Sequence, residues 1–196
     1  SRRNQLGLRV EIIDNGPGQR NYITDPFNNY DGWMGIERRG SSSQMFPKKS
    51  YGFETRDIEG NEIDTSLLGM PKESDWILNA HYSDKTLMRN VMTYHLARQM
   101  GHYAARTRFC EVVLNGQYWG VYAFMEKIKR DNDRVDISKL NPDDTLGPDV
   151  TGGYILKIDK GTGGSGAGWQ SNYPPPVNPQ GQVIYFQYEY PDFEAM

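Results

Sequence analysis

Residues 106–126 read RTRFCEVVLNGQYWGVYAFME and carry the clearest structural signal of the chain. Two segments, 106–114 and 117–126, flank the dipeptide Asn115-Gly116. Asn-Gly is the strongest short signal for a β-hairpin because both central residues of a two-residue turn must accept positive φ. The sequence therefore predicts an antiparallel hairpin whose register is nearly fixed.

Other segments of the chain also have the pattern of strands. Leu8, Val10 and Ile12 alternate with Arg9, Glu11 and Ile13, which is typical of a half-buried strand. Segments 32–39 and 49–56 alternate in the same way and are expected to form neighbouring antiparallel strands. We expect two more strands at 153–160 and 182–190, with a long irregular Gly/Pro-rich loop at 161–181 between them.

One long helix is predicted at 84–100, with Ser83 as its N-cap and Gly101 at its end. Its expected apolar face packs onto the sheet through Leu87, Val91 and Met92. The order of elements predicts an α+β fold, in which one long helix packs on an antiparallel sheet. The residues that the helical period places on the inward face of this helix are Leu87, Met88, Val91, Met92, His95, Leu96 and Met100.

Length and composition limit the class of protein. A chain of 196 residues fits one large domain. The net charge of −3 provides no broad basic field for nucleic acid. Apolar runs are far shorter than the roughly 20 residues that span a bilayer, so no membrane span is expected. Cys110, the only cysteine, is expected to be a small buried hydrophobe.

Residues 38–49 form a basic segment, RRGSSSQMFPKK, between two expected strands. Its small residues allow backbone N–H groups and serine hydroxyls to converge on an anion, and its lysines and arginines supply positive charge to phosphates. The alternative is a polar hairpin loop whose charges stay solvated. Both interpretations remain open from residue types alone.

Other candidate sites have weaker support. Residues 161–166, GTGGSG, match a dinucleotide fingerprint, but no helix follows to receive a pyrophosphate, so a loop is expected. Asp131, Asp133 and Asp136 lack the glycine and closing glutamate of an EF-hand, and a solvated turn is expected. His81, His95 and His102 have no zinc-ligand spacing, and His95 is expected to pack inward.

An ordered series of motifs resembles the CotH family of spore-coat-type atypical protein kinases, from about residue 32 to residue 159. The motifs are RRGSSSQ (38–44), FPKKSY (46–51), LLGMP (67–71), DWIL (75–78), LMRN (87–90), LNGQYWGVY (114–122), EKI (126–128) and GGY (152–154). The resemblance implies a protein-kinase-like fold that binds ATP with Mg²⁺ and phosphorylates serine on coat or secreted proteins. Residues 1–126 would be the small-lobe-like part, and residues 127–196 the start of the second lobe.

The resemblance also implies roles for individual residues. The loop at 40–44 would lie over the phosphates, and Lys48 or Lys49 would be the phosphate-pairing lysine. The helix would take the place of the kinase C-helix, although it offers Arg89 and Asn90 and no glutamate. The implied nucleotide-binding residues are Arg39, Ser41, Ser42, Ser43, Lys48, Lys49, Arg89, Met125 and Glu126.

The carboxylates that would hold Mg²⁺ are expected beyond Met196, and Asp159 is a weaker candidate. Residues 191–196 resemble the first turn of a helix, so we expect a truncated domain that binds nucleotide but transfers no phosphate alone. An extracellular, cell-surface or spore-coat location is expected. The alternatives are a surface adhesin that binds protein or glycan through exposed aromatic rings, and a structural coat component.

Overall fold

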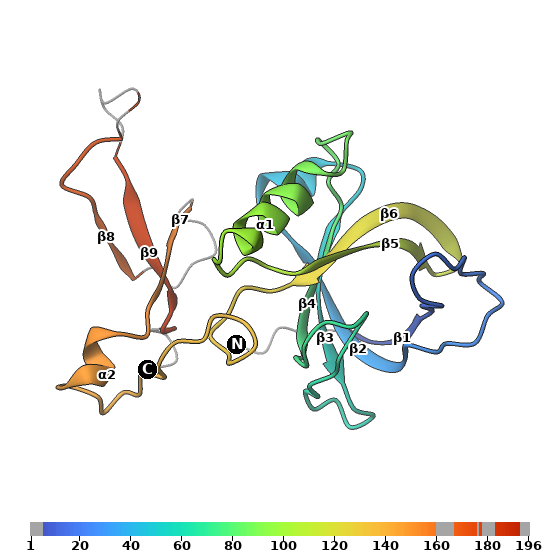
Figure 1. Cartoon of the computed structure of the whole chain (residues 1–196), viewed down its shortest axis with the longest axis horizontal. Helices are drawn as coiled ribbons and strands as arrows, with labels where there is room; N and C mark the ends of the chain where they lie inside the picture. Colours follow the sequence, from blue (N-terminus) through green and yellow to red (C-terminus); the bar gives the residue numbers. More distant parts are fainter. Residues whose placement is uncertain (1–5, 160–166, 176, 178–182, 193–196) are drawn as a thin grey trace. The chain divides into compact units, whose positions relative to one another are not determined.

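The computed structural model describes residues 6–159, 167–175, 177 and 183–192. It divides the chain into two units, residues 1–127 and residues 128–196. The first unit contains β1 (Leu6–Ile12), β2 (Tyr30–Arg39), a 3-10 turn (Ser42–Met45), β3 (Ser50–Arg56), β4 (Asp75–Asn79), α1 (Arg89–Gln99), β5 (Thr107–Leu114) and β6 (Gln117–Glu126) (Figure 1).

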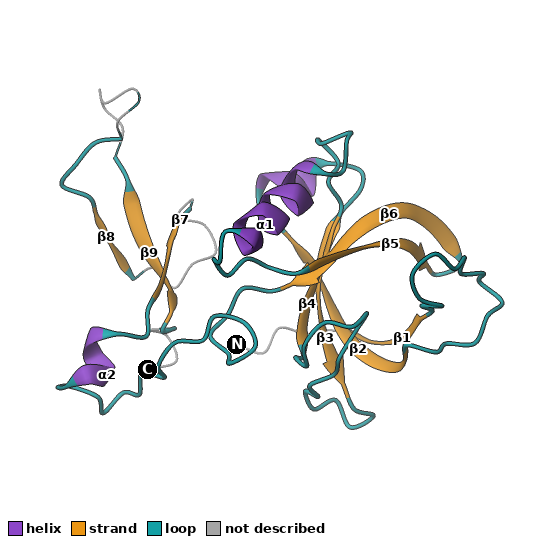
Figure 2. Cartoon of the chain, viewed as in Figure 1, coloured by secondary structure: helices purple, strands orange, loops and turns teal. Residues whose placement is uncertain are grey.

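The first unit is built on one antiparallel six-stranded sheet in the order β1-β2-β3-β4-β6-β5 (Figure 2). The pairing of β2 with β3 and the hairpin of β5 and β6 confirm two predictions from the sequence. Strand β4 was not predicted, and it pairs with both β3 and β6. Helix α1 lies between β4 and β5 in the chain. The hairpin that follows it places β6 beside β4 and β5 at the edge of the sheet.

The sheet curls around the main hydrophobic core. Leu8 on β1 and Cys110 on β5 come from the two edge strands, yet both pack against the same cluster of buried side chains. Within it, Trp76 stacks on Phe124 with their ring centroids 5.1 Å apart. The buried members of the cluster are Met34, Phe53, Leu67, Met70, Trp76 and Phe124.

Helix α1 is shorter than predicted, and its predicted inward face is buried only in part, at Val91. It begins at Arg89, because the backbone of Leu87 has a φ of 59°. Tyr94 packs against a second cluster formed by Ile77, Ala105 and Met125, whereas Met92 is 53% exposed. The prediction that Met92 faces the sheet is therefore wrong, as is the inward position of His95, which is exposed.

Of the two predicted boundary residues of α1, the structure confirms only the C-terminal one. Ser83 is not the N-cap: Asp84 accepts a hydrogen bond from the backbone N–H of Arg89 at 3.1 Å. Gly101 ends the helix as predicted, with a φ of 82° and its N–H bonded to the carbonyl of Arg98. Left-handed backbone at this position is the usual reason for glycine after a helix.

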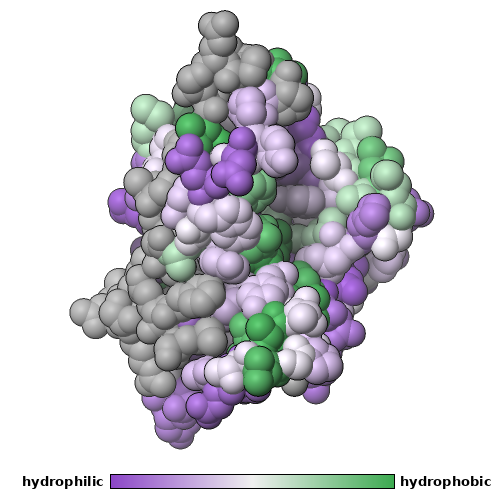
Figure 3. Space-filling view, turned by 90° about the vertical axis from the view of Figure 1, so that its left-hand side faces the viewer, coloured by the Kyte–Doolittle hydropathy of each residue, from purple (hydrophilic) through white to green (hydrophobic). Residues whose placement is uncertain are grey.

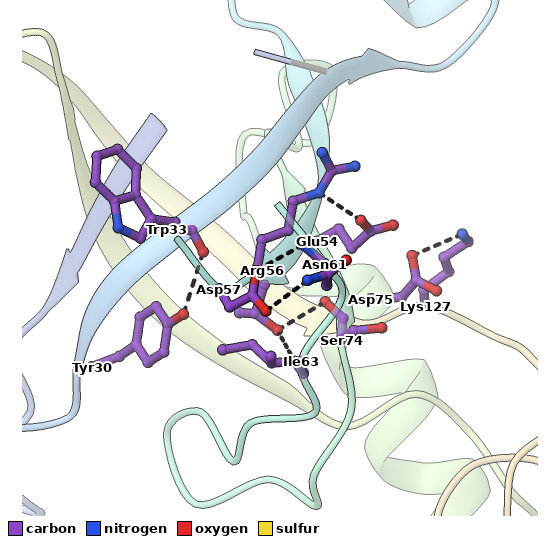
Figure 4. Close-up of polar contacts among 11 residues, drawn as sticks. Tyr30, Trp33, Glu54, Arg56, Asp57, Asn61, Ile63, Ser74, Asp75 and Lys127 are labelled. Atoms are coloured by element: carbon purple, nitrogen blue, oxygen red, sulfur yellow. Dashed lines mark hydrogen bonds and ion pairs between the residues drawn. The ribbon is translucent and has the colours of Figure 1, made fainter. Parts of the chain in front are cut away.

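Polar contacts fix the long connection between β3 and β4 (Figure 4). The Thr55 hydroxyl is buried and donates to the carbonyl of Ile63 at 2.6 Å. At the start of β4, Asp75 forms a 3.0 Å ion pair with Lys127, which follows β6. These contacts hold the segment that leads into β4.

The second unit contains α2 (Pro148–Thr151), β7 (Ile155–Ile158), β8 (Gly168–Gln170) and β9 (Tyr185–Tyr190). The three strands form an antiparallel sheet in the order β7-β9-β8. Strands β7 and β9 confirm the two predicted strands in shorter form, whereas β8 falls inside the predicted irregular loop. The fingerprint-like segment 161–166 lies outside the described residues.

Several apolar side chains of the second unit are exposed, on its strands and in its loops. Leu156 and Ile158, two residues apart on β7, are both exposed. Figure 3 shows small hydrophobic patches among hydrophilic side chains on the face that it draws. None of the helices among the described residues is long and apolar enough to cross a membrane.

Candidate functional site

A pocket of about 180 Å³ lies in the first unit, where three segments meet. The loop between β2 and β3 contributes Ser43, Phe46 and Lys48, and the end of β4 contributes Asn79. The segment 80–84 and the first turn of α1 complete the wall. The pocket thus joins residues that are about 40 positions apart in the sequence.

Pairing of β3 with β4 brings these segments together. Tyr51 of β3 lies opposite Leu78 of β4, so the start of one strand meets the end of the other. Just beyond this pair, the backbone N–H of Ala80 donates to the Ser50 hydroxyl at 3.0 Å. This contact anchors the segment 80–84 beside the lysine-containing loop.

Lys48 is held in a fixed position at the pocket wall. Its Nζ donates to the carbonyl oxygen of Val121 at 2.5 Å and lies 4.3 Å from the centre of the Tyr122 ring. Burial lowers the pKa of Lys48. An ammonium group has three N–H donors, so the bond to Val121 leaves donor capacity for a ligand in the pocket.

A bulge in β6 contributes to this position. Val112 of β5 pairs with Gly120, but Val113 pairs with Tyr118, so Trp119 is an extra residue on β6. Gly120 has a φ of 81°, and a Cβ added there would lie 3.6 Å from the Lys48 Nζ. Glycine within a strand often marks a bulge, so Gly120 is a sequence signal for the bulge beside Lys48.

Asp84 and Arg89 also line the pocket. Asp84 accepts hydrogen bonds from the Thr86 hydroxyl at 2.7 Å and from the Arg89 N–H, and the Thr86 hydroxyl is the main cause of its lowered pKa. The guanidinium of Arg89 lies 3.7 Å from the same carboxylate and is largely exposed. Lys48 and Arg89 together outnumber the one carboxylate in the wall.

A stacked aromatic pair lies beside these charges. The rings of Phe46 and Tyr82 have centroids 5.0 Å apart and both line the pocket. Lys85 lies 4.1 Å from the centre of the Tyr82 ring. The wall thus combines cationic and hydroxyl groups with an aromatic surface.

The structure gathers only some of the residues implied by the resemblance. Ser43, Lys48 and Arg89 line the pocket, whereas the other six residues do not. Lys49 instead donates to the carbonyl of Gln44 at 2.6 Å, within its own loop. Outside the pocket wall are Arg39 at the end of β2, Ser41 and Ser42 at the 3-10 turn, Lys49, Met125 and Glu126.

Met125 and Glu126 are buried at the end of β6. Met125 belongs to the second hydrophobic cluster, and its Sδ lies 4.0 Å from the side-chain nitrogen of the pocket residue Asn79. Glu126 accepts from the backbone N–H and the guanidinium of Arg106, each at 2.8 Å. Its carboxylate is therefore engaged within the sheet.

Acidic side chains do not cluster among the residues that the structure describes. Among the described residues, no group of three or more His, Cys, Asp or Glu side chains could hold a metal ion. Asp159 follows β7 in the second unit and is exposed, while Asp131 accepts a hydrogen bond from the backbone N–H of Asp133 in a turn. Asp84 is the one carboxylate among the described residues of the pocket wall.

Sequence reasoning missed most of the segment 79–84. Spacing argues against His81 as a zinc ligand, and the sequence predicts no ligand-binding role for Asn79, Tyr82 or Asp84. The available signal was the position of these polar residues directly after an apolar segment, Trp76-Ile77-Leu78, that is typical of a buried strand.

Comparison with known proteins identifies the family. Residues 36–193 match the family described as CotH kinase protein, which covers most of the chain and confirms the resemblance seen in the motifs. No curated protein matches the chain. The chain therefore belongs to the CotH family of kinase-like proteins.

Proposed function

We propose that the pocket binds the phosphate groups of ATP, and that the chain is the nucleotide-binding part of a protein kinase acting on serine in coat or secreted proteins. The observation that carries this proposal is Lys48, whose ammonium group is held at the pocket wall by Val121 and Tyr122. Ser43 and Arg89 add donors to the same wall. Phosphate oxygens are strong acceptors for such charged donors.

The chain's own residues would share the work of binding. Lys48 contributes a fixed positive charge, and Asp84 keeps Arg89 near the pocket without neutralising Lys48 as well. Phe46 and Tyr82 offer an aromatic surface next to the cations. Mg²⁺ would neutralise charge on the transferring phosphoryl group, and the described residues hold no cluster of three or more carboxylate, histidine or cysteine side chains that could bind it.

The two adjacent lysines provide a matched test of this site. Lys48→Ala should weaken binding of ATP and ADP by about tenfold or more, equivalent to about 1.4 kcal/mol. Lys49→Ala removes the same charge outside the pocket wall and should change affinity by less than about threefold. Titration calorimetry on the full chain measures both, with circular dichroism to confirm folding.

Equal affinities for Lys48→Ala and the parent protein would contradict the phosphate site. An equal loss in both variants would show that only net charge matters. Binding of a glycan or protein without any dependence on nucleotide would instead favour the adhesin alternative, for which exposed rings such as Tyr22, Trp33 and Tyr118 are available.

A further inference from the structure

His81 is a buried residue of the pocket wall with an unsatisfied polar atom. It lies two residues after β4 and is 8% exposed. Its Nε2 is shielded from solvent and has no hydrogen-bond partner in the part of the chain that the structure describes. Buried polar atoms are nearly always hydrogen-bonded, so an exception in a pocket points to a ligand that supplies the partner.

The backbone of His81 is held in an unusual conformation. Its φ is 46°, in the left-handed region that non-glycine residues rarely adopt. The side chain of Asn79 accepts from the His81 N–H at 3.3 Å, and the His81 carbonyl accepts from the N–H of Asp84 at 3.1 Å. Strained conformations of this kind are concentrated at ligand sites, and here local contacts keep the residue in the wall.

Burial and the charges around His81 both affect its protonation. Burial lowers the pKa of His81, the nearby Asp84 carboxylate partly opposes this effect, and Lys48 adds to it. Arg89, from α1, lines the same pocket. The neutral form of the imidazole is therefore favoured in the free protein, and an anion entering beside it would favour the protonated form.

We propose that His81 donates a hydrogen bond to a phosphate oxygen of the ligand and takes up a proton when that ligand binds. This inference rests on the proposed function, because it assigns a further role to a residue of the same pocket. Lys48 and Arg89 supply permanent charge, whereas His81 supplies a charge that forms only when the anion is present. Binding then becomes stronger as the pH falls from 8 to 6.

The test uses ¹⁵N-histidine NMR on the full chain. His95 and His102 are exposed and do not line the pocket, so their rings serve as internal controls. The signals are assigned with His81→Asn, because asparagine tolerates positive φ and does not titrate in this range. The ligands are inorganic triphosphate, ATP and adenosine, each followed from pH 6 to pH 8.

Triphosphate and ATP should move the ring nitrogens of His81 toward the imidazolium form at pH 7, whereas adenosine should not. The affinity of the parent protein should rise between pH 8 and pH 6 by about three- to tenfold more than that of His81→Asn, since uptake of one proton gives up to tenfold per pH unit. Titration of the phosphate itself is common to both proteins and cancels in this comparison.

The outcomes separate this inference from the proposed function. If ATP binds with dependence on Lys48 while the His81 signals stay unchanged, the inference is overturned and the phosphate site stands. If triphosphate moves His81 but ATP binds no better, the proton-linked contact stands and recognition of the nucleoside fails. Absence of binding by all three ligands overturns both.

Discussion

The carboxylate of Glu126 lies at the end of β6, next to Arg106, which directly precedes β5. It is fully buried and accepts two hydrogen bonds from Arg106, one from the backbone N–H and one from the guanidinium. A buried charge of this kind is costly unless its partner is present. The resemblance assigned Glu126 to nucleotide binding, but these contacts give its carboxylate a structural task.

Glu126→Ala should therefore lower the free energy of unfolding by about 3 kcal/mol, since it removes the partner of Arg106 and leaves a gap in the sheet. Glu111→Ala is the matched control on the same hairpin, because Glu111 is exposed. The control should cost about 0.5 kcal/mol or less. Urea denaturation measures both, and similar losses for the two variants would contradict the structural role of Glu126.

Cys110 should be unreactive in the folded protein. Burial raises the pKa of its thiol to about 12. At pH 8 the thiolate fraction is then roughly 10⁻⁴, and the thiolate is the form that reacts. Labelling with a chromogenic disulfide reagent at pH 8 should be undetectable in the native state and rapid in denaturant. Fast labelling of the native protein would show that Cys110 does not pack against the core.

Helix α1 demonstrates why periodicity alone misplaced an element. Its apolar residues fall on two sides, and the sequence offers no signal to choose between them. Contacts with residues distant in the chain determine which side of α1 packs inward: Tyr94 contacts the cluster formed by Ile77, Ala105 and Met125. The hairpin, by contrast, was predicted correctly because Asn115-Gly116 specifies it locally.

Two substitutions on α1 distinguish its faces. Tyr94→Ala should cost about 2 kcal/mol, because it removes a ring from the second cluster. Leu96→Lys places a charge at a position that is 54% exposed and should change stability by about 0.5 kcal/mol or less. Thermal unfolding measures both, and a larger loss for Leu96→Lys would mean that the helix packs through the face predicted from the sequence.

The candidate site shows the same limit of sequence reasoning. Lys48 and Ser43 were found because they share one basic, serine-rich segment. The other half of the pocket, at 79–84, joins them only through the non-local pairing of β3 with β4. Family resemblance supplied residue roles, but it did not distinguish Lys48 from Lys49, which the pocket geometry does.

At the scale of the whole molecule, the two core clusters and the candidate pocket belong to the first unit. Both hydrophobic clusters and every lining residue of the pocket lie within residues 1–127. The ion pair between Asp75 and Lys127 also lies within this unit. The described residues therefore place the core and the candidate site on the same side of the division.

A shortened chain of residues 1–127 should fold cooperatively and bind ATP with an affinity within about threefold of the full chain, because it keeps the whole pocket. Its affinity should still fall with Lys48→Ala. Calorimetry and urea denaturation of the shortened and full chains test this expectation. Loss of cooperative unfolding would show that the first unit depends on residues 128–196.

The bulge at Trp119 has a consequence for how the hairpin can vary. Tyr118 and Tyr122 are four residues apart on one strand, a spacing that normally places side chains on the same face, yet Tyr118 is 63% exposed and Tyr122 only 1%. The extra residue shifts the phase of β6 between the hairpin tip and the half of the strand that carries Val121. A sequence change confined to the hairpin tip is therefore expected to leave the contacts of Val121 and Tyr122 with Lys48 in place.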